Sequence, residues 1–205
     1  MTNELARSVV ALPEGETVLA AEPVAMGEWT VERLHSLPIP QLEQFYHTLP
    51  APSLAEMHGE YRGGYIGCER RISNGLWRLV AWNPLIGGVW QGKSFEPLSE
   101  SEGRGFNLLK LYGRVVRKWP MRITMGSSFI DGGEVLLLDY PFYRSGAAAV
   151  KMTDEIRKVT DHLYLGIGHW RLLIPLASVW FTLSGPVGPF DPGGMAFRRR
   201  VAYRA

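Results

Sequence analysis

The sequence is poor in cysteine, in long apolar runs and in net charge. Cys68 is the one cysteine among 205 residues, which excludes an internal disulfide framework and a zinc site built on several thiolates. The longest apolar run, Leu172 to Leu183, contains Pro175 and is shorter than the roughly 20 residues needed to span a bilayer. The first 25 residues carry four glutamates against Arg7, unlike the basic start of a signal peptide. We therefore expect a cytoplasmic protein without a membrane span.

The formal net charge is only +2, but it is unevenly divided. The first hundred residues hold twelve acids and seven bases, and the remainder holds eight acids and fifteen bases. A basic half can indicate a nucleic-acid surface. Here the basic residues are scattered along strand-like segments, apart from the run Arg198 to Arg200. We therefore expect no nucleic-acid partner, and an acidic N-terminal segment packed on a basic surface explains the asymmetry.

Catalytic motifs are also scarce. The run Gly87 to Ser94 satisfies the letters of the phosphate-binding loop G-x-x-x-x-G-K-[ST], but Pro97 follows so closely that the required helix cannot form. A strand carrying Trp90 and Lys93 on opposite faces is the better interpretation. The sequence contains no G-x-S-x-G elbow, no H-E-x-x-H and no paired-histidine spacing. We therefore expect neither a metal nor a cofactor.

The composition, 46% hydrophobic and 20% charged, is typical of one globular domain with a substantial core. Residues 1–28 lack sustained periodicity and contain Pro13 and Pro23, which predicts a loosely ordered N-terminal arm. Residues 29–205 are expected to form a single domain. Apolar residues at helical spacing predict short helices near 31–57 and 74–82.

Short strand-like segments separated by turn signals dominate the rest of the chain. They span about 58–66, 88–96, 104–113, 120–130, 134–140, 152–158, 162–170, 177–184 and 196–203. Asp131-Gly132-Gly133 supplies the residues of a hairpin turn, and Thr160 to His162 marks another. Because no crossover helix separates most of these segments, neighbours should be antiparallel. The sequence predicts a mainly β protein, a single antiparallel barrel of eight or nine strands with short N-terminal helices.

Gly59-Glu-Tyr61-Arg-Gly63 resembles the G-x-W-type first-strand motif of lipocalin-like (calycin) barrels, including the uncharacterised bacterial group named for a GXWXG motif. Gly92 to Phe95, Gly103 to Asn107 and Asp154 to Arg157 are similar to segments of such bacterial proteins. The likeness covers about residues 50–184. It implies an antiparallel barrel with a ligand cavity and no assigned chemistry.

Polar and aromatic residues in or beside these strands are the candidate ligand contacts. Alternation places Asp154 and Ile156 on one face, and Glu155 and Arg157 on the other. A buried carboxylate has to be paired, coordinated or shifted in pKa. His169 could act as a haem ligand, as a general base or as a hydrogen-bonded structural residue. The candidate ligand-binding set is Trp90, Lys93, Asn107, Arg122, Tyr140, Tyr143, Asp154, Glu155, Arg157 and His169.

Three functions fit these features. The first is binding of a small hydrophobic ligand, of lipid, polyketide, terpenoid or pigment type, in the barrel cavity. The second is a cofactor-independent cyclase or isomerase that holds such a substrate for acid and base groups, with Lys93, Asp154, Glu155 and Arg157 as candidates. The third is a non-catalytic interaction module. A homodimer formed through an edge strand is compatible with each of them.

Overall fold

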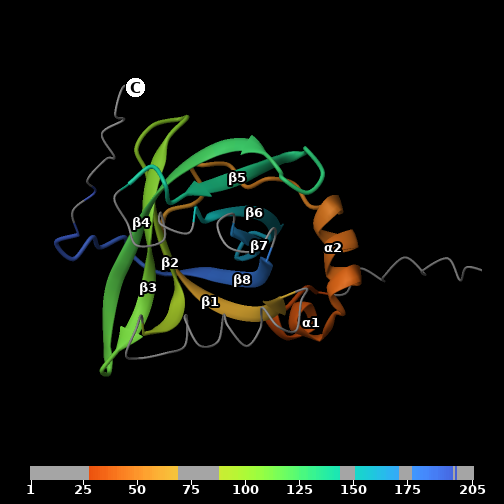
Figure 1. The fold of residues 1–205 in the computed structure, drawn as a ribbon, viewed down its shortest axis with the longest axis horizontal. Coiled ribbons are helices and arrows are strands. Elements are labelled where there is room, and N and C mark those ends of the chain that lie inside the picture. The colour runs from red at the N-terminus through yellow and green to blue at the C-terminus, as the bar shows by residue number, and fades with distance from the viewer. Residues whose placement is uncertain (1–27, 69–87, 144–150, 171–176, 196, 198–205) are drawn as a thin grey trace, which may run out of the picture.

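The computed structural model describes residues 28–68, 88–143, 151–170, 177–195 and 197. Eight strands form a closed barrel in which each strand is antiparallel to its neighbours in the sequence, and the last strand pairs with the first. The strands are β1 (Gly59–Cys68), β2 (Val89–Pro97), β3 (Gly103–Leu111), β4 (Arg114–Ser127), β5 (Glu134–Asp139), β6 (Thr153–Thr160), β7 (Leu163–Trp170) and β8 (Ala177–Gly188). Figure 1 looks into this barrel. The predicted fold class is confirmed.

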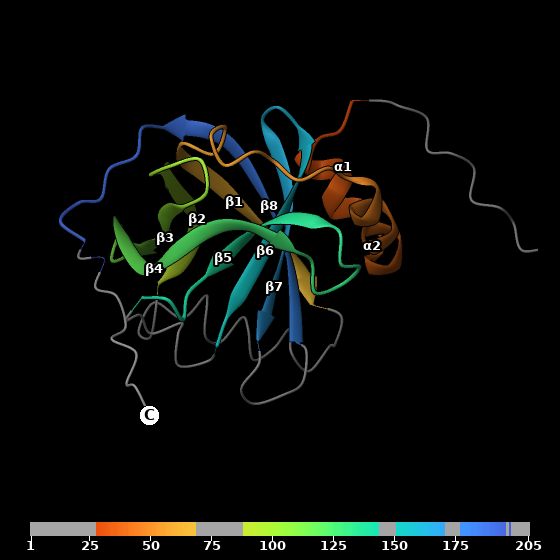
Figure 2. The same cartoon turned by 90° about the horizontal axis from the view of Figure 1, so that it is seen from above.

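Two short helices precede the barrel, α1 (Val31–Ser36) and α2 (Ile39–Thr48). The Thr30 side chain caps α1 by accepting a hydrogen bond from the Arg33 N–H. Pro40 lies in the first turn of α2, where the missing N–H costs nothing. Both helices lie on one side of the barrel (Figures 1 and 2). No helix in the described part of the chain is long and apolar enough to cross a membrane.

Two apolar clusters stabilise the barrel and attach the helices to it. One fills the barrel lumen and includes Tyr61, Phe95, Ile156 and Leu183. The other lies between the helices and the outer surface of the sheet, where Tyr46 of α2 meets Trp180 of β8 edge to face, with ring centroids 5.4 Å apart. The strands that face α2 are therefore buried on both sides, and side chains on their outer face are inaccessible as well.

The predicted turns are present. Residues 128–133 connect β4 to β5, and Gly132 has a φ of +73°, a conformation that glycine adopts without strain. The short connection at Asp161 and His162 joins β6 to β7. The helix predicted at 74–82 lies outside the described residues, as do nearly all of the N-terminal arm and the ninth strand. Phe197, which the structure does describe, belongs to no strand.

The directions of the Trp90 and Lys93 side chains differ from the prediction. Simple alternation placed them on opposite faces, but both point into the lumen. A bulge in β2 leaves Gln91 without a partner, because Trp90 pairs with Leu109 and Gly92 pairs with the adjacent Leu108. Gly92 has a φ of +145°, and a Cβ there would collide with the Tyr61 carbonyl oxygen. Glycine therefore permits the bulge that brings the two side chains together.

Candidate functional site: a polar network in the barrel lumen

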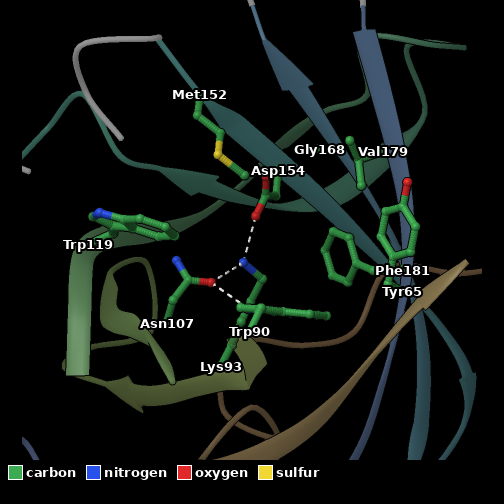
Figure 3. A pocket seen from close by; sticks show the side chains of 10 residues that line it. All are labelled: Tyr65, Trp90, Lys93, Asn107, Trp119, Met152, Asp154, Gly168, Val179 and Phe181. Carbon is green, nitrogen blue, oxygen red and sulfur yellow. Dashed lines mark hydrogen bonds and ion pairs between the residues drawn. The ribbon is translucent and has the colours of Figure 1, made fainter. Parts of the chain in front are cut away.

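The Lys93 ammonium group occupies the centre of the lumen and is almost completely buried. Its Nζ lies 2.9 Å from Asn107 Oδ1, 2.6 Å from the Tyr140 hydroxyl and 2.7 Å from Asp154 Oδ2. These three contacts use all three N–H donors of an ammonium group. Figure 3 shows the bonds to Asn107 and Asp154. Lys93 is therefore held as a cation by a carboxylate and two neutral acceptors.

The partners of Lys93 also bind one another. Trp90 Nε1 donates to Asn107 Oδ1 over 2.9 Å, and Asn107 Nδ2 donates to the Tyr140 hydroxyl over 2.9 Å. The Tyr140 hydroxyl in turn donates to Asp154 Oδ2 over 2.9 Å. We call these five residues (Trp90, Lys93, Asn107, Tyr140 and Asp154) the lumen network. They come from β2, β3, β6 and the residue that follows β5, so barrel closure assembles them.

One buried polar side-chain atom of the lumen network has no partner among the described residues, namely Asp154 Oδ1. Gly168 of the adjacent β7 faces this oxygen, and a Cβ at that position would lie 2.8 Å from it. The glycine leaves the oxygen uncovered. An unsatisfied charged acceptor in a buried site is costly, so Asp154 Oδ1 is the point at which the network can accept a hydrogen bond from another molecule.

Burial and charge shape the titration of the network. Burial lowers the pKa of Lys93 from its ordinary value, and the neighbouring Asp154 carboxylate opposes that change. Burial raises the pKa of Tyr140 well above its ordinary value, and the charge of Asp154 adds to this rise. Tyr140 therefore stays neutral and acts as a hydrogen-bond donor. The rings of Phe181, Tyr140 and Trp90 also lie 5.2 to 5.6 Å from Lys93 Nζ, within cation–π range.

Apolar side chains form the walls around this charged centre. The described lining residues outside the lumen network are Tyr65, Trp119, Met152, Gly168, Val179 and Phe181. The space they enclose is about 30 Å³, room for one or two water molecules. Aliphatic and aromatic side chains fill the rest of the lumen, so a larger ligand has to displace some of the side chains that line it.

Five of the ten predicted residues thus meet in the lumen. Glu155, Arg157 and His169 do not, because they lie on the outer face of the barrel. The predicted alternation along β6 is correct, and it sends Asp154 inward and its neighbours outward. Glu155 accepts hydrogen bonds from the Phe129 N–H over 3.1 Å, and its other oxygen lies 2.8 Å from His169 Nε2. His169 is thus a buried, hydrogen-bonded residue outside the lumen, as one of its predicted roles proposed.

Arg157 is buried like Glu155 and His169, and it also has partners on the outer side of the barrel. Its guanidinium donates to both oxygens of Asp131, over 2.7 and 2.8 Å, and to the Tyr46 carbonyl over 2.9 Å. Arg122 also lies outside the lumen, with Nη2 donating to Asp139 over 3.1 Å. Tyr143 is buried against Phe142 and Phe197. Arg122, Tyr143 and Arg157 were predicted to contact a ligand in the lumen. The structure places them on the outer side of the barrel instead.

Sequence reasoning missed six of the described lining residues, Tyr65, Trp119, Met152, Gly168, Val179 and Phe181. Met152 lies two positions before Asp154, and Val179 lies two before Phe181, so alternation could have added Met152 once Asp154 was known to face inward. Trp119 gave no such signal. It occupies a bulge in β4 with a φ of +56°. Among the described residues, no group of three or more His, Cys, Asp or Glu side chains could hold a metal ion.

The eight described strands form a closed up-and-down barrel, so the fold is that of a calycin-like barrel. No protein-family model and no curated protein matches the sequence. A solved structure of a protein from Thermomonospora curvata is similar, with a TM-score of 0.51 and 16% identity, over 72% of this chain and 87% of that one. A structure titled Odorant Binding Protein OBP1 has a TM-score of 0.40 and 12% identity, over 70% and 79%. The first likeness concerns the fold alone, and membership of the GXWXG group stays a prediction.

Proposed function

We propose that the protein binds a small, largely apolar ring compound in the barrel lumen, through a hydrogen bond that the ligand donates to Asp154 Oδ1. This oxygen carries the proposal, because it is the one buried side-chain N or O atom of the lumen network that lacks a partner among the described residues. A ligand hydroxyl or N–H supplies what it lacks. An acceptor group on the ligand would instead find the donors of Lys93 already used.

The walls define the rest of the ligand. Trp90, Trp119 and Phe181 present flat aromatic surfaces to the lumen, which favour stacking against a planar ring. The enclosed space is small, so we expect Met152 and the partly buried Trp119 to move when the ligand enters. Methionine adapts readily to such changes. Of the ligand types considered, a compact polyketide or pigment ring fits better than a long lipid chain.

A pair of matched probes tests the proposal. 2-Naphthol carries a donating hydroxyl, and 2-methoxynaphthalene has the same rings without the donor. Titration of the full chain, followed by the fluorescence of its tryptophans, should show that 2-naphthol binds more tightly. In Asp154→Asn the amide can turn its N–H₂ group toward the lumen, so the affinity for 2-naphthol should fall about tenfold or more, as expected for a lost bond to a charged group. The affinity for the methoxy compound should stay the same.

Asp161→Asn is the matched control, because Asp161 is exposed at the β6–β7 turn and, among the described residues, its carboxylate pairs only with Lys158. It should bind both probes like the wild type. Equal affinity of the wild type for both probes would overturn the proposal. So would an unchanged affinity of Asp154→Asn for 2-naphthol.

The cyclase or isomerase alternative draws on the same network. The Tyr140 hydroxyl bridges Lys93 and Asp154, an arrangement through which a proton can pass. Native mass spectrometry of the purified protein, followed by extraction of any bound compound and its incubation with fresh protein, separates the two functions. A binding protein returns the compound unchanged, whereas an enzyme returns an isomer. A protein that retains nothing and binds neither probe would favour the interaction module.

A further inference from the structure

A second hollow lies on the outside of the barrel, over β4, β5 and β6. We call it the outer cleft. Its volume is about 420 Å³, within the range of roughly 300 to 1,000 Å³ typical of small-molecule sites. It is much larger than the space enclosed in the lumen, and it is open to solvent without any movement of the described side chains. The proposed function leaves this cleft unused.

The strand register explains why polar groups gather in the outer cleft. Arg122 of β4 pairs with Asp139 of β5, and Asp139 pairs with Thr153 of β6. Directly opposed residues of antiparallel strands share a face of the sheet, so the three side chains form one row across the outer surface. Thr124 lies two residues beyond Arg122 and therefore on the same face. The row is thus a product of the barrel itself.

The charges in the outer cleft favour an anion. Arg122 and Lys151 supply two positive charges, and Asp139 supplies one negative charge. Arg122 uses Nη2 for Asp139, and its guanidinium lies over the Phe142 ring, 4.2 Å from the centroid, which fixes its plane. Lys151 is exposed and makes no hydrogen bond or ion pair within the described part of the chain. The Asp139 carboxylate balances only one of the two cations that line the cleft, so one positive charge is left over.

The remaining walls are apolar or neutral. Phe129, Leu137 and Pro141 border the cleft, and Phe129 is about half exposed, at 48%. The hydroxyl groups of Thr124 and Thr153 add neutral donors beside the cations. A ligand that satisfies all of these groups has an anionic head and a short apolar body.

We propose that the outer cleft is a second binding site, which takes small organic anions, carboxylates or phosphate monoesters, with Arg122 and Lys151 holding the anionic group. The apolar body of the ligand lies against Phe129 and Leu137. This site lies on the opposite face of the sheet from Asp154, and it does not depend on the function proposed for the lumen.

Isothermal titration of the full chain with benzoate, phenyl phosphate and neutral benzyl alcohol tests the proposal. The two anions should bind and the alcohol should not. Arg122→Gln and Lys151→Gln should each weaken binding of the preferred anion about tenfold, as for a lost charge-assisted bond. Lys110→Gln is the matched control, because Lys110 is an exposed cation on β3 outside the cleft.

Amide chemical shifts distinguish the outer cleft from the lumen. Benzoate or phenyl phosphate should shift the amides of Thr124 and Thr153, and its affinity should be unchanged in Asp154→Asn. The proposal is overturned if neither anion binds at millimolar concentration. It is also overturned if both cleft variants bind like Lys110→Gln, or if Asp154→Asn abolishes anion binding, which would place the anion in the lumen.

Discussion

Arg157 is a buried cation, and a few individual contacts compensate for the burial of its charge. Its side chain is 3% exposed. The pKa of Asp131 lies well below its usual range, mainly because the carboxylate accepts hydrogen bonds from Arg157. Hydrogen bonds with His47 and with the Gly133 N–H lower it further. Because His47 belongs to α2 and Arg157 to β6, the carboxylate joins three parts of the chain.

We predict that Asp131→Asn lowers the free energy of unfolding by about 2 to 3 kcal/mol at pH 7, because the buried guanidinium loses its counter-charge. The folded pKa of Asp131 lies below the unfolded value of about 3.9. Its contribution is therefore complete above about pH 5 and is lost as the pH falls below about 4. The difference between the variant and the wild type should shrink over that acid range in urea unfolding experiments.

The exposed Asp161 again provides the control, and Asp161→Asn should change stability by no more than about 0.5 kcal/mol. If the stability gap of Asp131→Asn stays constant from pH 7 to pH 3, the ion pair is not its cause.

The candidate residues show where sequence reasoning stops. Alternation correctly separated Asp154 from Glu155, since the period of a strand is fixed at two residues. It could not say which of the two faces inward, because a shift of one residue exchanges the faces. Trp90 and Lys93 were assigned to different faces for another reason. Their shared orientation depends on the bulge at Gln91, which local periodicity does not reveal.

Whole elements were predicted more reliably than side-chain directions. Six of the eight described strands were placed close to their observed bounds, since turn signals separate them. β8 extends four residues beyond its predicted end at 184, and the first residues of β4, 114–119, were missed. Pro120 lies within β4, and proline is normally excluded from a paired strand. The structure accommodates Pro120 at the bulge beside Trp119, where the register shifts between Lys118 and Met121.

Helix α2 acts as a cover for the outer face of β6 to β8. Leu42 and Tyr46 are its buried residues, and both belong to the cluster that contains Trp180. We predict that Leu42→Ala lowers the free energy of unfolding by about 2 to 5 kcal/mol, because it leaves a cavity beneath the helix. Gln44→Ala, on the exposed side of the same helix, should change it by no more than about 0.5 kcal/mol. Urea unfolding measures both. Equal effects would mean that α2 does not pack as described.

At the scale of the whole molecule, closure of the barrel separates two chemical environments with one sheet. β6 contributes to both, with Asp154 facing the lumen and Thr153 facing the outer cleft. Closure also bears on the expected homodimer. Each of the eight described strands is paired on both sides, so none of them offers a free edge to a second copy. The homodimer stays a prediction, and it requires a surface other than a strand edge.

The effect of the lumen network on the free energy of unfolding of the whole protein tests whether the network serves binding or stability. Lys93→Met and Asp154→Leu each leave one buried charge unpaired, so each should lower the free energy of unfolding by about 3 to 5 kcal/mol. In the double variant both charges are gone, and apolar groups of similar volume often replace a buried ion pair without loss. We therefore expect the double variant to unfold at a urea concentration close to that of the wild type, with a strong coupling between the two sites. It should no longer prefer 2-naphthol over 2-methoxynaphthalene. If the double variant is less stable than either single variant, the ion pair is a structural requirement of the barrel, and its charge needs no ligand to explain it.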